Sequence, residues 1–325
     1  MTTSVRSKWI FAFILFNLLI VIFIIFLPPG IKVEVRNAFF SHKTDDTFFR
    51  MGLQSFAKNK DFKWSTDEIQ KEFNRNTYFR KNMSSLVNSH LDDSLLAQKV
   101  VLLFSKNGSA EPSDCGLYSN NLEENIKWLN TNEGHGCCSD HAQVFIAMGL
   151  LAGLPVREVH NDSHTFNEFW DRQLNKWIWI DPQYWLMAKD SNGILLSLIE
   201  IQDVYRKGHR PNFYMFTNQR NYLNDISLND VFNTYYSSDN FRVIRMTLGN
   251  NVFRVDKFNS YLNFLPKSLI QTILLSLDIQ PGFVYYEYEV NLERKYHTYL
   301  FFIILYVLLI LSVNFILWRN FKKKI

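Results

Sequence analysis

The chain has 325 residues, of which 47% are hydrophobic, and its 35 Lys and Arg residues against 31 Asp and Glu residues give a net charge of +4. This composition excludes a disordered or fibrous chain, and three cysteines are too few for a disulfide framework. The basic excess lies at the two chain tips, in Arg6, Lys8, Arg319, Lys322, Lys323 and Lys324. Without these six, the other 29 basic and 31 acidic residues leave a net charge of −2. We therefore expect no nucleic-acid partner, because such binding needs a basic face on the folded region.

Two uncharged runs predict membrane-spanning helices. Residues 9–27 and residues 298–318 contain no charge, and each has about the ~20 residues that cross a bilayer as a helix. A buried core helix is the alternative for either run, and a cleaved signal peptide is a further alternative for the first. The length of the first run and the sequence LPPG after it favour an uncleaved signal anchor.

The flanking charges predict the topology of this integral membrane protein. The four basic residues of the C-terminal tip favour a cytoplasmic location for that tip. Two spans then place both termini in the cytoplasm and residues 30–297 outside it, with the lipid bilayer as a partner. Asn161 begins an N-x-S glycosylation motif beside the candidate site described below, where a glycan would crowd it. We therefore treat the motif as chance and expect a bacterial inner or cell membrane.

The central region reads as helices followed by antiparallel strands. The expected helices, from capping signals and apolar periodicity, are Ser65–Phe79, Asp92–Phe104, Leu122–Leu129 and Cys138–Leu151. The expected strands are Val156–His160, His164–Trp170 and Lys176–Ile180, the last two forming a hairpin. Gly153 is the expected residue after the fourth helix, where a left-handed conformation is common.

The last hundred residues carry weaker signals. We expect a hairpin over Phe241–Val255 that turns at Gly249, a helix over Ser268–Leu277 and a strand over Phe283–Val290. The resulting domains are residues 1–29 (tip and span), 30–190 (catalytic domain), 191–297 (mixed α/β extension) and 298–325 (span and basic tail). The sequence leaves open whether residues 191–297 are a separate extension or more of the same domain.

Three residues are candidates for cysteine chemistry. Cys138 follows Gly136 at the start of an expected helix, where the helix dipole and free backbone amides favour a thiolate and supply half of an oxyanion hole. His164 opens one strand of the hairpin and is a candidate base. Asp181 ends the partner strand, where it is placed to orient the imidazole.

These residues lie in four ordered motifs that resemble the transglutaminase-like superfamily, over roughly residues 120–185. The motifs are Gly136-Cys137-Cys138-Ser139-Asp140-His141-Ala142, Gly153-Leu154-Pro155-Val156-Arg157, His164-Thr165-Phe166-Asn167-Glu168 and Trp179-Ile180-Asp181-Pro182. The resemblance implies an α+β, papain-like core with a nucleophile helix packed on an antiparallel sheet. It also implies Cys138 as nucleophile, His164 as general base and Asp181 as its orienting partner, with no cofactor and no metal.

The function that follows is a membrane-tethered cysteine enzyme. It would cleave amide or peptide bonds, or transfer their acyl groups, through a thioester. A location in the cell envelope makes peptides, proteins or envelope polymers the expected substrates. The superfamily also contains inactive members, so the alternative is a non-catalytic binding or assembly protein of the envelope.

Several neighbouring residues compete for these roles. Cys137 is the rival nucleophile, and otherwise a core residue or a disulfide partner of Cys115. His160 is the rival base, and we expect it instead at a strand end or in a pocket. A zinc site is a third reading, but the candidates lack the paired ligand spacing of structural zinc sites. Those candidates are His135, Cys137, Cys138, Asp140, His141, His160 and His164.

The remaining polar residues of the motifs have simpler expected roles. We expect Arg157 to be structural and Asp140 to be an acid favoured by the helix dipole. Glu168 lies either on the strand face of the triad or in solvent. Asn132 or His135 is a candidate for the second oxyanion donor. The aromatic residues of FNEFW and KWIWI are expected to pack the sheet.

Overall fold

A computed structural model describes most of the central chain in two compact units. It describes residues 11, 13–18, 29–59, 62, 71, 81–87, 89–105, 122–130, 136–217, 228–250, 252–262, 264–265 and 267–322. One unit comprises residues 42–290, and the other comprises residues 1–41 with 291–325. Each unit is treated by itself below.

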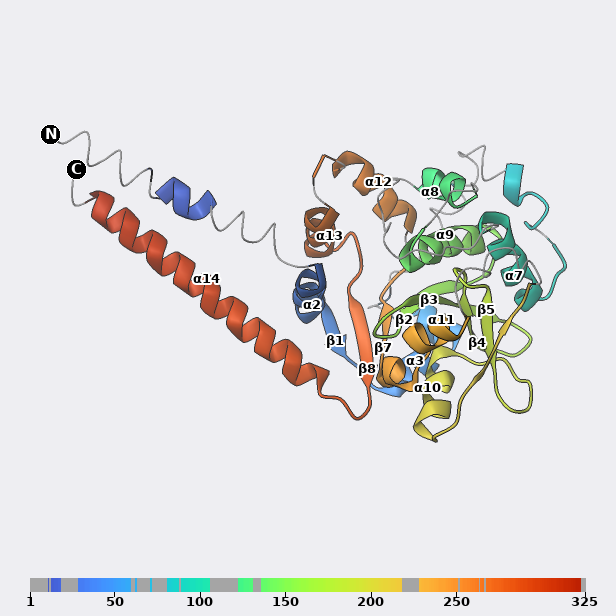
Figure 1. Ribbon diagram of the computed structural model, residues 1–325. Coiled ribbons are helices and arrows are strands. Elements are labelled where there is room, and N and C mark those ends of the chain that lie inside the picture. Colours follow the sequence, from blue (N-terminus) through green and yellow to red (C-terminus); the bar gives the residue numbers. More distant parts are fainter. Residues whose placement is uncertain are drawn as a thin grey trace. The chain divides into compact units, whose positions relative to one another are not determined.

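The larger unit is built on one eight-stranded sheet in the order β1-β8-β7-β2-β3-β4-β5-β6 (Figure 1). The strands are β1 (Ser41–Lys43), β2 (Val156–His160), β3 (Thr165–Asp171), β4 (Lys176–Asp181), β5 (Leu186–Lys189), β6 (Asn212–Met215), β7 (Val243–Thr247) and β8 (Phe283–Glu287). Every pairing from β8 through to β6 is antiparallel.

Helices flank the strands in the chain. They are α2 (Pro29–Phe40), α3 (Asp46–Arg50), α4 (Leu53–Ala57), α7 (Asp93–Phe104), α8 (Leu122–Leu129), α9 (Cys138–Leu151), α10 (Leu198–Arg206), α11 (Leu228–Tyr235), α12 (Val252–Leu262), α13 (Lys267–Ser276) and α14 (Leu292–Lys322), with a 3₁₀ turn η3 (Ser238–Arg242).

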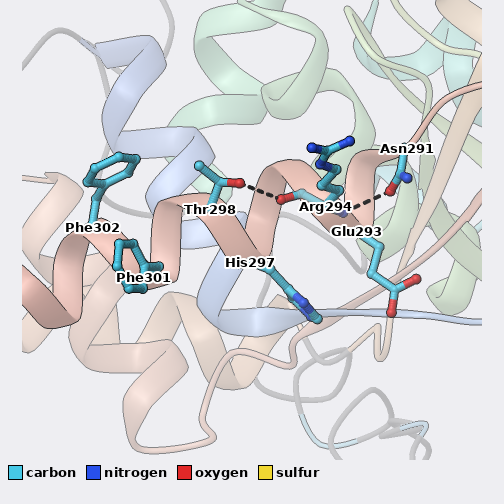
Figure 2. A pocket seen from close by; sticks show the side chains of 7 residues that line it. All are labelled: Asn291, Glu293, Arg294, His297, Thr298, Phe301 and Phe302. Carbon is cyan, nitrogen blue, oxygen red and sulfur yellow. Dashed lines mark hydrogen bonds between the residues drawn. The ribbon is translucent and has the colours of Figure 1, made fainter.

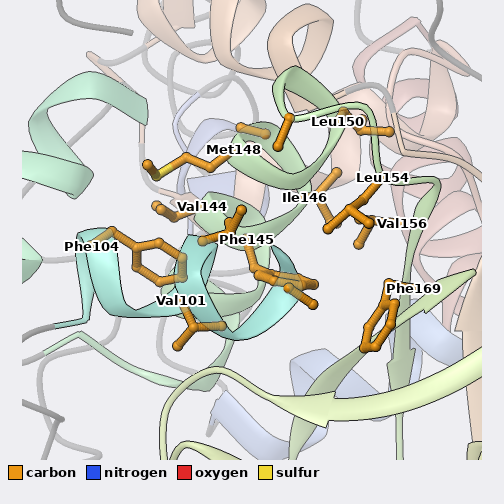
Figure 3. Packing of buried hydrophobic residues seen from close by; sticks show 14 of the residues in the cluster. Val101, Phe104, Val144, Phe145, Ile146, Met148, Leu150, Leu154, Val156 and Phe169 are labelled. Carbon is orange, nitrogen blue, oxygen red and sulfur yellow. The ribbon is translucent and has the colours of Figure 1, made fainter. Parts of the chain in front are cut away.

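A hydrophobic core lies on each face of the sheet, because side chains alternate between the faces along a strand. Phe169 and Ile178 join the core formed with α7, α8 and α9, whereas Phe166 and Trp179 join the core formed with α3, α4 and α10. Figure 3 shows the packing of α9 in the first core.

The helix α9 lies directly on the sheet and is buried almost all round. A Cβ atom on Gly149 would come within 2.7 Å of Val156, so glycine permits this close approach of the helix to β2. Every residue from Val144 to Leu151 is buried. The apolar face expected from the sequence is therefore only part of the buried surface of this helix.

The structure confirms the expected order of helices before strands. The helices at Leu122–Leu129 and Cys138–Leu151 have the expected bounds. The carboxylate of Asp92 caps α7 by accepting a hydrogen bond from the amide of Leu95 at 2.7 Å. Gly153 has φ +84° after α9, in the left-handed region that favours glycine. Most of the expected helix Ser65–Phe79 lies outside the described residues.

The hairpin expected over Phe241–Val255 is wrong. Its first half forms η3 and β7, and the segment after Gly249 becomes the helix α12. The reason is non-local pairing. The strand β7 pairs with β2 on one side and with β8 on the other, so a second strand immediately after it in the sequence is not required. The helix expected at Ser268–Leu277 and the strand expected from Phe283 are both present.

Residues 191–290 continue the same architecture. They supply β6 at one edge of the sheet, and β7 and β8 on the other side of β2. Residues 42–290 also form one compact unit. The strands on either side of position 190 therefore share one sheet and its two cores.

The smaller unit contains the helices α2 and α14, which pack against each other. Asn17 and Asn314 exchange side-chain hydrogen bonds of 3.0 and 3.3 Å within it. At the start of α14 the carboxamide of Asn291 accepts a hydrogen bond from the amide of Arg294 at 2.9 Å (Figure 2). These contacts define the start of α14 and one side-chain pairing inside this unit.

One helix among the described residues is long and apolar enough to cross a membrane. It runs over Leu292–Ile316, with a mean hydropathy of 2.6 in its most apolar stretch. Its apolar side chains are exposed; Phe301 and Leu309, for example, are 63% and 60% exposed. The first expected span, residues 9–27, lies largely outside the described residues.

Candidate active site

Cys138 is the first residue of α9, as expected. A Cβ atom on Gly136, two residues earlier, would collide with the side chain of Leu129 of α8, so a larger residue there would require Leu129 to move. Asp140 turns back and accepts a hydrogen bond from the amide of Cys137 at 3.1 Å. Asp140 therefore caps the N-terminus of the helix, and it lies where the helix dipole favours an acidic residue.

The structure brings His164 and Asp181 together. His164 lies just before β3 and Asp181 ends β4, and the Nε2 atom of His164 lies 2.8 Å from Oδ2 of Asp181. Both side chains are buried, at 2% and 0% exposed. A carboxylate oxygen accepts hydrogen bonds, so this contact assigns the shared proton to Nε2, and Nδ1 is the ring nitrogen that does not face Asp181.

Three further donors hold the Asp181 carboxylate. The amides of Gln183 and Tyr184 donate to Oδ1 at 2.8 and 3.3 Å, and the Tyr236 hydroxyl donates to Oδ2. Four hydrogen bonds thus fix the orientation of the carboxylate that orients His164. Burial, followed by the nearby charge of Asp181, raises the pKa of Tyr236 well above its usual range, so this hydroxyl remains a donor.

Aromatic rings surround the imidazole of His164. The rings of Tyr184 and Tyr235 lie at 5.5 and 4.8 Å between centroids, tilted by 32° and 34°, and Phe166 contacts the imidazole edge-on at 4.7 Å. Sequence reasoning missed Tyr235 and Tyr236, which come from the end of α11. No local motif marks them, because their role arises from long-range packing against a motif more than fifty residues earlier.

Cys138 lies beside the residue that follows His164. The backbone and side chain of Thr165 act to lower the pKa of the Cys138 thiol. The sulfur also interacts electrostatically with Tyr184 and Tyr236, the two rings that adjoin His164 and Asp181. Cys138 therefore lies within electrostatic range of two tyrosines that pack around the His164–Asp181 pair.

The protonation of Cys138 differs from the sequence-based expectation of a stabilised thiolate. A hydrogen bond with Cys137, together with burial, raises the pKa of the Cys138 thiol well above its usual range. The donors of Thr165 act in the opposite direction but do not outweigh these two effects. The thiol is therefore protonated at neutral pH, and a base must accept its proton before the sulfur can attack.

Residues 85–182 match the family model of the transglutaminase-like superfamily. This transglutaminase-like segment begins before α7 and contains Cys138, His164 and Asp181, whereas Tyr235 and Tyr236 lie beyond it. It covers less than a third of the chain.

No curated protein matches the chain. Two solved structures are similar to this chain. One was described in work on DNA duplex opening by the Rad4/XPC nucleotide excision repair complex, and the other is Rad4-Rad23 bound to a 6-4 photoproduct UV lesion. Their chains are 14% and 12% identical to this one, with TM-scores of 0.25 and 0.24. Each alignment covers 72% of this chain but 56% and 54% of those chains, so this chain spans little more than half their length.

Two motif residues of the transglutaminase-like segment pair with each other. Arg157 and Glu168 form a fully buried ion pair, with a nitrogen–oxygen distance of 2.6 Å. Glu168 also accepts a hydrogen bond from the amide of Leu198 at 2.7 Å, and Arg157 donates to the carbonyl of Phe49 at 2.8 Å. The expected structural role of Arg157 is confirmed, and Glu168 lies in the core rather than in solvent.

The rival residues occupy distinct places. Cys137 is buried at the N-cap of α9, and its candidate disulfide partner Cys115 lies outside the described residues. His141 is fully buried, and its Nδ1 lies 3.1 Å from the carbonyl oxygen of Cys137. Desolvation by burial lowers the pKa of His141, so its ring is neutral. His160 ends β2, as expected, and contacts Glu158 and Thr165 rather than Asp181.

The remaining candidates concern metal and oxyanion binding. Within the part of the chain that the structure describes, no three His, Cys, Asp or Glu side chains converge as a metal site would require. Asn132 and His135, the candidates for the second oxyanion donor, lie outside the described residues.

Proposed function

We propose that the protein is a membrane-tethered cysteine enzyme that cleaves or transfers acyl groups at amide or peptide bonds. The observation that carries this proposal is the 2.8 Å hydrogen bond between His164 Nε2 and Asp181. It leaves Nδ1 unprotonated, as a base for the thiol of Cys138. The match of residues 85–182 to the transglutaminase-like superfamily supports the same reaction class.

The reaction begins with proton transfer, because the resting Cys138 thiol is protonated. His164 takes the thiol proton as the sulfur attacks the amide carbonyl, and the amides at the start of α9 stabilise the oxyanion. The carbon–nitrogen bond then breaks, and His164 returns the proton to the leaving amine. The remaining thioester reacts with water to give an acid or with an amine to give a new amide. Asp181, held by Tyr236, keeps the imidazole in one tautomer throughout.

The membrane tether is proposed from two apolar segments. The exposed apolar surface of α14 suits a bilayer, and residues 9–27 supply a second uncharged run. The reciprocal hydrogen bonds of Asn17 and Asn314 support a pairing of these segments, since polar groups in lipid need partners. Both termini then lie in the cytoplasm and the sheet-containing unit lies outside it, where peptides and envelope polymers are the substrates. A cytoplasmic reporter fused after Lys324 should be active, and a periplasmic reporter at the same place should not.

The test of the chemistry uses the full chain in detergent. Iodoacetamide modification of each cysteine is followed by peptide mass spectrometry in wild type, Cys138→Ala, Cys137→Ala and His164→Ala. We expect His164→Ala to slow modification of Cys138 at neutral pH by about threefold for each unit by which the thiol pKa rises, because the remaining thiolate is more nucleophilic. Cys137→Ala assigns the modified cysteine: Cys138 should still be modified in it, and no more slowly than in wild type. Equal modification of Cys138 in wild type and His164→Ala would contradict the proposed triad.

A non-catalytic binding or assembly role is the second candidate. It is favoured by the near-complete burial of His164 and Asp181 and by the protonated state of Cys138. For such a module, Cys138 would react only after unfolding, with no dependence on His164. Assays on dimethylcasein then separate the two candidates. A transferase incorporates dansylcadaverine and releases ammonia, a carboxamide hydrolase releases ammonia alone, and a peptide-bond hydrolase produces new amino termini. Cys138→Ala abolishes each of these products, and a binding module gives none.

A further inference from the structure

One carboxamide ties the loop that carries His164. Residues 161–164 connect β2 to β3, and the amide of Asn161 donates to the carbonyl of His164 at 3.1 Å, which closes the loop. The side-chain oxygen of Asn161 accepts hydrogen bonds from the amides of Ser163 and His164 at 2.9 and 2.8 Å, as in an Asx turn. The backbone of His164 is therefore held at both its N–H and its C=O group by the same residue.

The nitrogen of the same carboxamide reaches α11. It donates to the carbonyl of Tyr235 at 2.7 Å, and Asn161 is only 3% exposed. The partners fix the orientation of the carboxamide, because a flipped side chain would set its NH₂ group against two backbone N–H groups and its oxygen against a carbonyl. The nitrogen to which a glycan of the N-x-S motif would be attached is engaged in this bond. Asn161 thus joins the backbone of His164 to the end of α11.

The end of α11 supplies two of the groups around the pair of His164 and Asp181. The ring of Tyr235 lies 4.8 Å from the imidazole between centroids, and the hydroxyl of Tyr236 donates to Oδ2 of Asp181. The same oxygen atom lies 2.8 Å from Nε2 of His164. Asn161 therefore belongs to a closed ring of contacts, which runs from His164 through Asn161 to α11, from α11 to Asp181, and from Asp181 back to the imidazole.

We propose that Asn161 is a positioning residue for His164, which keeps the imidazole aligned with Asp181. It acts through the backbone of His164 and through α11. A hydrogen bond weakens steeply as its angle falls toward about 120°, so Nε2 must be held in direction as well as in distance. Without the carboxamide, the loop and the end of α11 move independently, and the ring spends part of its time with Nδ1 protonated instead of Nε2. This role rests on the proposed function in that His164 is the base.

The middle of the loop has anchors that do not depend on the Asn161 side chain. Asp162 pairs with Arg245 of β7 at 2.8 Å, and the amide of Asp162 donates to the carbonyl of Asn240 at 3.1 Å. A variant that lacks the Asn161 carboxamide therefore retains contacts that hold the loop in place.

Asn240 also offers a matched control. Its side-chain nitrogen donates to the carbonyl of Thr234 at 2.6 Å, one residue before the carbonyl that Asn161 binds. Among the described residues, this side chain makes no hydrogen bond to His164. Asn240→Ala and Asn161→Ala thus each remove one bond from an asparagine to the end of α11, but only the second also releases His164.

The test reads the tautomer of His164 by nitrogen NMR of the full chain in detergent, labelled with ¹⁵N-histidine. The signals of His164 are those lost in His164→Ala. Wild type and Asn240→Ala should show His164 with the proton on Nε2 alone, whereas Asn161→Ala should show both tautomers. Iodoacetamide should modify Cys138 about threefold more slowly at pH 7 in Asn161→Ala, the effect of a rise of about one unit in the thiol pKa, and at the wild-type rate in Asn240→Ala. Asn161→Ser keeps an oxygen for the turn but lacks the donor to Tyr235, so it should also show both tautomers.

A His164→Ala background separates positioning from packing. Adding Asn161→Ala there should not slow Cys138 modification further, because the residue through which Asn161 acts is gone. A further loss of the same size would indicate packing alone and overturn the proposal, as would a single tautomer in Asn161→Ala or in Asn161→Ser.

The same data separate this proposal from the proposed function. Slowing by His164→Ala with a wild-type rate and tautomer in Asn161→Ala would leave the triad standing and reject the role of Asn161. No slowing by His164→Ala would contradict the triad itself. Urea unfolding followed by tryptophan fluorescence verifies that each variant folds, and Asn161→Ser carries the test where Asn161→Ala does not unfold cooperatively.

Discussion

The buried ion pair of Arg157 and Glu168 makes a quantitative prediction about stability. The guanidinium lies 4.1 Å above the ring of Trp177, and both charged side chains are 0% exposed. Glu168→Gln keeps the shape of the side chain but leaves the Arg157 charge buried without its counter-ion. Arg157→Met does the converse. Each single change should lower the free energy of unfolding by about 3–5 kcal/mol, because removing one partner exposes the other to the full desolvation cost.

The double variant decides whether this cost belongs to the pair. Replacing both charges removes the unpaired ion, so the double variant should lose at least about 1 kcal/mol less than the two single losses added together. Urea unfolding of the full chain in detergent, followed by tryptophan fluorescence, measures all four proteins, with Trp177 as a reporter beside the pair. Single losses below about 1 kcal/mol, or strict additivity in the double variant, would refute the reasoning.

Three further predictions test separate parts of the structure. Cys137→Ala removes the hydrogen bond that raises the Cys138 pKa, so iodoacetamide should modify Cys138 faster at pH 7. The rate should rise about threefold for each unit by which the pKa falls, because a thiolate of lower pKa is a weaker nucleophile. An unchanged rate would contradict the assigned cause. The pKa of Glu158 is lower in the folded state, so its contribution to the free energy of unfolding is lost as the pH falls below about 4.5. In Glu158→Gln the free energy of unfolding should therefore depend less on pH in this range, whereas Asp239→Asn at an exposed site should leave that dependence unchanged. Gly153→Ala should cost about 1–2 kcal/mol in urea unfolding, because φ is +84° there, and a loss under about 0.3 kcal/mol would argue against a strained position.

Local signals predicted the part of the fold around the site well. The helix Cys138–Leu151, the strand Val156–His160 and the hairpin that carries His164 depend on short-range periodicity, capping and turns, all of which can be read from neighbouring residues. The strand β7 is different. Its partners lie more than 80 residues before it and about 40 residues after it, so no pattern near Gly249 distinguishes it from half of a hairpin.

The chemistry of the site was predictable only in its outline. The spacing of motifs indicated that Asp181 faces His164, and the structure shows that hydrogen bond. The contribution of Tyr236 was not predictable, because it depends on how α11 packs. For Cys138 the helix dipole is one influence among several: a hydrogen bond with Cys137 and burial act on the same sulfur and raise the pKa of its thiol.

The pairing of β2 with β3 determines the surroundings of both candidate bases, His160 and His164. His164 and Thr165 are consecutive, and their side chains lead to different networks: His164 packs on Phe166 and Tyr236, whereas Thr165 meets His160. Successive residues at a strand alternate between faces, so one step along the chain supplies contacts on both faces of the sheet. A shift of the register by one residue would exchange these faces and disrupt both networks together. The same register therefore underlies both the His160–Thr165 contact and the placement of His164 at the end of β3.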